Sequence, residues 1–114
     1  MFFLLILSVL AKKSLKPGEF LVPDDYIGFE GATFYDQETK YITPGLSTGV
    51  RKIMIKVLKK SGFKFKTKGV YFQTHGPRYE TKAEIKLIKN FGDVVGMTMA
   101  NEATLAKEAG LEYG

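Results

Sequence analysis

GVYFQTHGPRYETKAEIKLIKNFGDVVGMTMANEATLAKEAG, at residues 69–110, contains the same order of patterns twice: an apolar run and then a segment with helical signals. The apolar residues at 70–73 predict a strand, and DVVGMTM at residues 93–99 predicts a second strand of the buried type. Strand, helix, strand, helix in this order indicates a parallel or mostly parallel sheet with helices packed on its faces.

Both helices of this stretch carry signals at their ends. Thr81 and Glu84 form the T-x-x-E signature of a capping box, which predicts a helix that begins just after Thr81 and stops at Gly92. Asn101 is the expected N-cap of the second helix, and Gly110 is its expected end.

A third helix is predicted upstream, over residues 47–62. Its apolar residues recur at i, i+3, i+4, i+7 and i+8, and cationic side chains fill the other face. The apolar residues are Val50, Ile53, Met54, Val57 and Leu58. This pattern predicts an amphipathic helix that ends at Gly62.

The N-terminal part of the chain is predicted to add strands and a long loop. The apolar opening at residues 1–11 favours a strand buried on both faces of a sheet, and a secretory or anchoring segment is the alternative. Residues 20–22 predict a short strand after the turn at Pro17 and Gly18. Residues 28–45 mix glycines, charges and aromatics without a period, which indicates a surface loop.

Composition limits the possible classes of function. The chain has 114 residues, of which 45% are apolar and 25% charged, as is typical of one globular domain. It has no cysteine and a single histidine, His75, so disulfides, thiolate metal sites and multi-histidine zinc sites are excluded. The formal net charge of +5 is compatible with a phosphorylated ligand, a nucleic acid or an anionic membrane.

The ends of the two predicted strands are candidate ligand sites, because ligands of open α/β sheets bind outside the carboxyl ends of the strands. In GPRYET, at residues 76–81, Tyr79 and Glu80 suit a planar ligand that donates hydrogen bonds, such as a purine. Arg78 suits an anion or a neighbouring carboxylate. At the second strand end, Thr98 and the start of the next helix suit an anion. Turn and cap chemistry alone is the competing interpretation of both sites.

Two further features have structural explanations. Lysines interleaved with Phe63 and Phe65 are a pattern found in nucleic-acid-binding surfaces, but a solvated helix face and a protected strand edge explain it better. The lysines are Lys56, Lys59, Lys60, Lys64, Lys66 and Lys68. His75 is interpreted as structural, because no serine, cysteine or aspartate close to it in the sequence suggests a triad.

Four segments together resemble the family of trimeric purine nucleoside phosphorylases and methylthioadenosine phosphorylases. They are LKPGEFLVPDDYI, TFYD, GVYFQTHGPRYETKAEI and DVVGMTMANEATLAKEAGLEY, in this order and spacing. The resemblance runs from about Ser14 to the C-terminus. It implies a three-layer α/β/α fold with a mixed, mostly parallel sheet, in which residues 1–114 form a single partial domain truncated at both ends.

The resemblance also implies an activity, the phosphorolysis of 6-oxopurine nucleosides or 5′-methylthioadenosine. Inorganic phosphate is the implied co-substrate, and no metal or organic cofactor is implied. A homo-oligomer, either a trimer or a hexamer, is expected by resemblance. The absence of cysteine suits a cytoplasmic location, and neither a membrane nor a nucleic-acid partner is expected.

The resemblance assigns roles to four residues. Tyr79 takes the place of an aromatic side chain that packs against the purine, and Glu80 that of a carboxylate that accepts a hydrogen bond from a 6-oxopurine. Met97 is expected under the ribose. Thr98 is expected to donate to phosphate.

The sequence departs from the family pattern mainly in the elements that bind phosphate. The family's Gly-rich phosphate loop and its Arg-His element are absent, and Lys40 and Tyr41 stand where a histidine usually precedes the equivalent of Thr43. The chain also ends before a loop that contacts the purine in the family. The alternative is therefore a catalytically incomplete purine-binding remnant, or half of a split or hetero-oligomeric phosphorylase that pairs with a complementary N-terminal segment.

Overall fold

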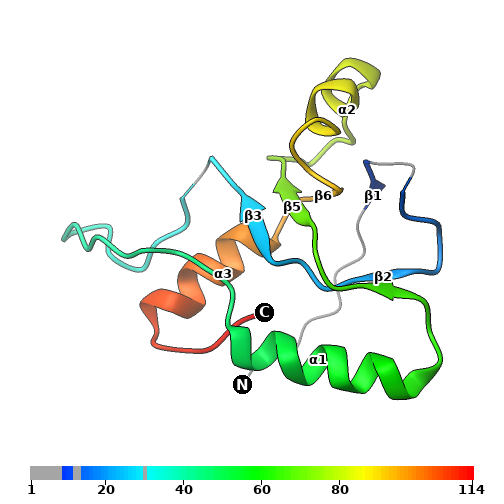
Figure 1. The fold of residues 1–114 in the computed structure, drawn as a ribbon. Helices are drawn as coiled ribbons and strands as arrows, with labels where there is room; N and C mark the ends of the chain where they lie inside the picture. Colours follow the sequence, from blue (N-terminus) through cyan, green and yellow to red (C-terminus); the bar gives the residue numbers. More distant parts are fainter. Residues whose placement is uncertain (1–8, 12–13, 30) are drawn as a thin grey trace.

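The computed structural model describes residues 9–11, 14–29 and 31–114, and its centre is a four-stranded sheet (Figure 1). The strands in spatial order are β1 (Val9–Leu10), β6 (Val94–Gly96), β5 (Val70–Gln73) and β3 (Asp25–Ile27). β5 runs parallel to both of its neighbours, whereas β1 is antiparallel to β6. The predicted mixed, mostly parallel sheet is confirmed.

Two strands differ from the prediction. Most of the strand predicted for residues 1–11 lies outside the described residues, which include only its last part, β1. The sequence does not predict β3, because Pro23 and two aspartates open that segment. It becomes a strand through its neighbour, since its three residues pair in register with Val70, Tyr71 and Phe72 of β5.

Helix α1 (Thr48–Ser61) has the ends that the sequence predicts. The Ser47 side chain accepts a hydrogen bond from the first turn, and Gly62 follows the helix with a φ of 75°. Its apolar face is only partly covered, since Ile53 and Val57 remain 41% and 60% exposed. Periodicity predicts the helix correctly but not the extent of its burial.

A second, two-stranded sheet consists of β2 (Phe20–Leu21) and β4 (Phe65–Lys66), which run parallel. Arg51 of α1 binds the links that lead from these strands to the main sheet. Its Nε donates to the Pro23 carbonyl at 2.5 Å, and its Nη2 donates to the Thr67 carbonyl at 2.7 Å. β2 also confirms the short strand predicted in this region.

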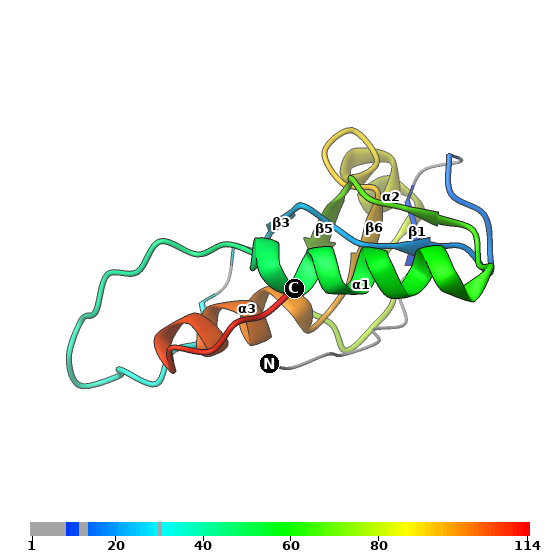
Figure 2. The ribbon, with the colours of Figure 1, turned by 60° about the horizontal axis from the view of Figure 1, so that its bottom comes forward.

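Helix α2 (Lys82–Ile88) begins with the predicted capping box. The Thr81 hydroxyl accepts from the Glu84 N–H at 3.2 Å, and the Glu84 carboxylate accepts from the Thr81 N–H at 2.7 Å. The helix stops earlier than predicted, because the chain tightens into a turn in which the Gly92 N–H donates to the Ile88 carbonyl. The strands lie between α1 and α2 in both views of the molecule (Figures 1 and 2).

Helix α3 (Met99–Glu108) begins earlier than predicted. Its N-cap residue is Thr98, so the prediction of Asn101 as N-cap is wrong. Instead, Oε1 of Gln73 accepts from the Ala100 N–H at 2.7 Å and from the Asn101 N–H at 3.3 Å. A side chain at the end of β5 therefore satisfies the first turn of α3. The glycine predicted to end the helix follows it with a φ of 73°.

The core lies where β5 and β6 meet α3, and its main buried cluster consists of Leu15, Tyr71, Val94, Met99, Ala103 and Tyr113. Tyr71 is 2% exposed, and its hydroxyl accepts from the Thr98 N–H at 3.4 Å. A Cβ added at Gly96 would come 2.2 Å from this hydroxyl oxygen. Because Gly96 has no side chain, the Tyr71 ring fits beside it and its hydroxyl can reach the start of α3.

The long loop before α1 contains no strand or helix among its described residues, as the sequence predicts. It is attached to α3 through Glu108, which is 9% exposed. The Thr33 hydroxyl and the Phe34 N–H donate to the two carboxylate oxygens of Glu108, each at 2.7 Å. These two bonds fix the loop next to the helix although most of its residues are exposed.

Candidate functional site

A cleft of about 380 Å³ opens where β5 ends. Its walls are the end of β5, the turn that follows, α2 and one aromatic side chain of the long loop. The lining residues include Phe29, Thr74, His75, Gly76, Arg78, Glu80, Glu84 and Leu87. This is the carboxyl end of a central parallel strand, where the sequence predicts a ligand site.

The turn after β5 packs against the residue that follows β6. Gly76 has a φ of 69°, and a Cβ on it would come 2.7 Å from the Met97 sulfur. Glycine suits this backbone conformation, which residues with a side chain rarely adopt, and it leaves room for the Met97 side chain. The contact joins the turn to Met97, which is predicted to lie under a ribose and is half-buried.

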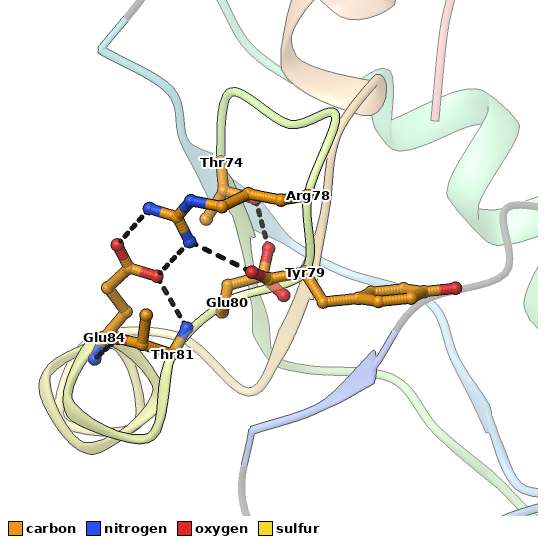
Figure 3. Close-up of polar contacts among 6 residues, drawn as sticks. All are labelled: Thr74, Arg78, Tyr79, Glu80, Thr81 and Glu84. Carbon is orange, nitrogen blue, oxygen red and sulfur yellow. Dashed lines mark hydrogen bonds and ion pairs between the residues drawn. The ribbon is translucent and has the colours of Figure 1, made fainter.

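Glu80 is a predicted site residue that lines the cleft. Its Oε1 accepts a hydrogen bond from the Thr74 hydroxyl (Figure 3). Thr74 is itself fixed, because its N–H donates to the Gly96 carbonyl of β6 at 2.8 Å. No sequence pattern singles out Thr74, since a hydroxyl residue at the end of a strand has no periodicity or motif of its own.

Arg78 braces a carboxylate, which is one of the two roles that its place in the sequence allows. Its Nη1 and Nη2 donate to the two oxygens of Glu84 at 2.9 and 2.7 Å, and Nη1 also donates to the Tyr79 carbonyl at 3.0 Å (Figure 3). The same Glu84 carboxylate closes the capping box of α2. The turn and the helix are therefore joined by one bidentate ion pair.

The ion pair changes the acidity of Glu84. The hydrogen bond from Arg78, and after it the one from the Thr81 N–H, lowers the pKa of Glu84 from 4.5 to about 2. A carboxylate whose pKa is lowered by folding stabilises the fold above its unfolded pKa, and this contribution disappears as the pH falls through the folded pKa.

We expect Glu84→Gln to be less stable to urea than the unmodified chain at pH 6, and the difference to shrink between about pH 4.5 and pH 2. The reason is that protonation of Glu84 at low pH removes the negative charge that binds Arg78, and the substitution has already removed this charge from the variant. Urea unfolding followed by circular dichroism at several pH values measures this. Glu38→Gln, in the exposed loop, is the control. A difference between chain and variant that does not depend on pH would contradict the assignment.

Tyr79 does not line the cleft. Its side chain extends away from Arg78 and Glu84 (Figure 3) and is 81% exposed. Of the two residues predicted to contact a purine, Glu80 therefore lies within the cleft and Tyr79 lies outside the cleft.

Thr98 lies at the start of α3, also outside the cleft. It is exposed, and its side chain makes no capping bond. Gln73 already accepts from the N–H groups of Ala100 and Asn101. An anion at this helix start would thus meet a hydroxyl group and only part of the usual set of free N–H groups.

The lysine run lies on the outer face of α1 and on the segment around β4. All its members are exposed except Lys66, which is half-buried and donates to the Ser14 carbonyl. Phe63 packs on Phe20 with ring centroids 5.2 Å apart.

His75, interpreted from the sequence as structural, lines the cleft. Among the described residues, no three acidic or histidine side chains are grouped to hold a metal ion.

The chain is an α/β protein with a cleft at the carboxyl end of a central parallel strand, which is the place where open α/β sheets bind ligands. A model of the phosphorylase superfamily matches residues 9–114. The chain belongs to this superfamily.

Relatives and solved structures agree with this assignment. The chain is 50% identical over 95 residues to a probable 6-oxopurine nucleoside phosphorylase of Archaeoglobus fulgidus, a match that covers 82% of this chain and 39% of the relative. It is 45% identical over 109 residues to a probable S-methyl-5′-thioinosine phosphorylase of Methanocaldococcus jannaschii, covering 90% of this chain and 42% of the relative.

A Schistosoma mansoni purine nucleoside phosphorylase, solved with a monocyclic inhibitor, matches with a TM-score of 0.74 and 30% identity, over 93% of this chain and 45% of that one. The fold prediction is confirmed. The chain spans less than half the length of these proteins.

Proposed function

We propose that this chain serves the phosphorolysis of purine nucleosides and that it favours bases with a 6-oxo group. The observation that carries the proposal is the Glu80 carboxylate, which lines the cleft at the end of β5 and has one oxygen held by Thr74. The 50% identity to a relative named for 6-oxopurine nucleosides supports the same preference.

The base preference follows from hydrogen-bond chemistry. A 6-oxopurine carries a hydrogen on N1 and can donate it to a carboxylate, whereas adenine has a lone pair on N1 and would face Glu80 with an acceptor. A charged hydrogen bond that one ligand makes and the other cannot make discriminates strongly between the two. The proposal covers nucleosides with either a hydroxyl or a methylthio group on C5′.

The proposed reaction transfers a ribosyl group to phosphate. An oxygen of inorganic phosphate attacks C1′, the bond from C1′ to N9 of the purine breaks, and its electron pair leaves with the base, which takes up a proton. The protein positions the reactants and stabilises the charge that develops on them. In this proposal Thr98 donates to phosphate, Met97 contacts the ribose and Tyr79 packs against a purine, with no metal or organic cofactor.

The proposed partners are a purine nucleoside, phosphate and further copies of this chain in a trimer or hexamer. Assembly provides a setting in which the exposed Tyr79 side chain would be covered. Within the described part of the chain, no helix combines the length and apolar character needed to cross a membrane. A cytoplasmic location is proposed because the sequence contains no cysteine.

A second candidate function is a purine-binding remnant, or half of a split phosphorylase. It is favoured by the state of the predicted phosphate site, where Gln73 occupies two N–H groups of α3 and Thr98 stands outside the cleft. In this case the chain would bind a purine but need a complementary segment for the reaction.

The test follows base release from inosine, guanosine and methylthioadenosine by the purified chain, with and without inorganic phosphate. We expect phosphate-dependent release from inosine and guanosine that Thr98→Ala reduces. Release that does not need phosphate would contradict phosphorolysis. If a folded chain releases no base but becomes active when coexpressed with an N-terminal segment of a relative, the split form is correct; no association would contradict the split form.

A further inference from the structure

Thr74 occupies the point where β5, β6 and the cleft meet. Its backbone is held by β6, since its N–H donates to the Gly96 carbonyl at 2.8 Å. Its hydroxyl donates to Oε1 of Glu80 (Figure 3) and also lies 3.5 Å from the same Gly96 carbonyl oxygen. A rigid strand end is thus connected directly to the carboxylate proposed to read the base.

The other strong donor near this carboxylate is already engaged. Both terminal nitrogens of Arg78 bind Glu84, and one of them also binds the Tyr79 carbonyl. Arg78 therefore shapes the turn without forming a hydrogen bond to Glu80. Within the described residues, the Thr74 hydroxyl is the one hydrogen-bond donor to the Glu80 carboxylate. The second oxygen of Glu80, Oε2, has no hydrogen-bond partner among these residues.

We infer that Thr74 is a positioning residue that sets the base specificity of this cleft. By donating to Oε1 it fixes the rotation of the Glu80 carboxylate and leaves Oε2 as the acceptor for the N1–H of a 6-oxopurine. Without the hydroxyl, the carboxylate can turn in the half-buried cleft, and the acceptor loses its fixed direction. The inference rests on the proposed function and adds the residue that makes Glu80 selective.

The test compares Thr74→Val, which has nearly the same shape without the donor, with Thr74→Ser, which keeps the hydroxyl. Calorimetric titration of each purified chain with hypoxanthine and with adenine gives the ratio of the two dissociation constants. We expect Thr74→Val to reduce the preference for hypoxanthine by about 10-fold, the effect typical of a lost hydrogen bond to a charged group. Thr74→Ser should keep the preference within about 2-fold.

Thr104→Val is the matched control. The Thr104 hydroxyl donates to the Ala100 carbonyl at 2.8 Å within α3, so this variant also loses one partly buried hydroxyl bond, but away from the cleft. We expect Thr104→Val to prefer hypoxanthine over adenine as strongly as the unmodified chain does. An unchanged preference in Thr74→Val, or an equal loss in Thr104→Val, would overturn the inference.

A measurement without ligand separates this inference from the proposed function. The ¹³C resonance of the Glu80 side-chain carboxyl should move in Thr74→Val and stay in place in Thr104→Val. If the unmodified chain binds neither base, the proposed function and the specificity role of Thr74 are both contradicted. If it binds hypoxanthine while the Glu80 resonance is unchanged in Thr74→Val, the proposed function stands and the positioning role is overturned.

Discussion

Glu80→Gln should lower kcat/KM for the phosphorolysis of inosine by about 100-fold, the size typical of removing one group that stabilises the transition state. The substitution keeps the shape of the side chain but replaces the charged acceptor by an amide that can turn its NH₂ group toward the base. Phosphorolysis of methylthioadenosine should change far less, because its adenine has no hydrogen on N1 to donate.

Initial rates of base release with both nucleosides, measured on the unmodified chain and the variant, test this expectation. Glu38→Gln makes the same change of charge in the exposed loop and should have no effect on either rate. An equal fall of both rates in Glu80→Gln would show that Glu80 supports the fold or phosphate rather than the base. If the chain is active only with a complementary segment, the same comparison applies to the reconstituted enzyme.

Tyr71→Ala should destabilise the chain by about 3–5 kcal/mol, the usual range when a large buried aromatic side chain is truncated. Tyr71 is 2% exposed and belongs to the main buried cluster. Its hydroxyl also binds the Thr98 N–H, so the variant loses a contact between β5 and the start of α3 as well as apolar burial. A loss of this size is a large part of the stability of an ordinary domain.

Urea unfolding monitored by circular dichroism measures the free energy of unfolding. Tyr41→Ala is the control, because Tyr41 is 93% exposed, and it should change this free energy by no more than about 0.5 kcal/mol. Similar effects of the two substitutions would contradict the placement of the core. Tyr71→Phe keeps the ring and removes the hydroxyl. It should lower the free energy of unfolding by about 1 kcal/mol, a value between those of the two alanine variants.

Local signals explain which helix ends can be predicted. The ends of α1 and the start of α2 are encoded within a few residues, by Ser47, Gly62 and the pair of Thr81 and Glu84. The start of α3 is encoded elsewhere, because its first free N–H groups bind the Gln73 side chain of β5. A cap supplied from a neighbouring strand has no signature in the sequence of the helix itself.

The strands show the same difference between local and distant causes. β5 and β6 are apolar runs that predict strands by themselves. β3 is short and begins with an aspartate, and it is a strand because it pairs with β5. Likewise the period of α1 predicts an apolar face, whereas the exposure of Ile53 and Val57 depends on what else packs there.

In the candidate site, too, some features can be predicted from the local sequence and others cannot. Glu80 is predicted from a local cluster of residue types on a stiff turn, and it lines the cleft. Its partner Thr74, and the pairing of Arg78 with Glu84 rather than with a ligand, depend on side-chain directions that spacing does not give. The position of Tyr79 outside the cleft is also a three-dimensional property, since Tyr79 is adjacent in the sequence to Glu80, which lines the cleft.

The most direct test of the central claim is to locate a bound purine on this chain. A ¹⁵N-labelled sample is titrated with hypoxanthine in phosphate buffer, and the backbone amide shifts are followed by NMR. The account predicts saturable shifts concentrated at the end of β5, in the turn at residues 76–81 and at the start of α2, and their loss in Glu80→Gln. Shifts concentrated on the lysines of α1, or the absence of any saturable shift in a folded chain, would contradict it.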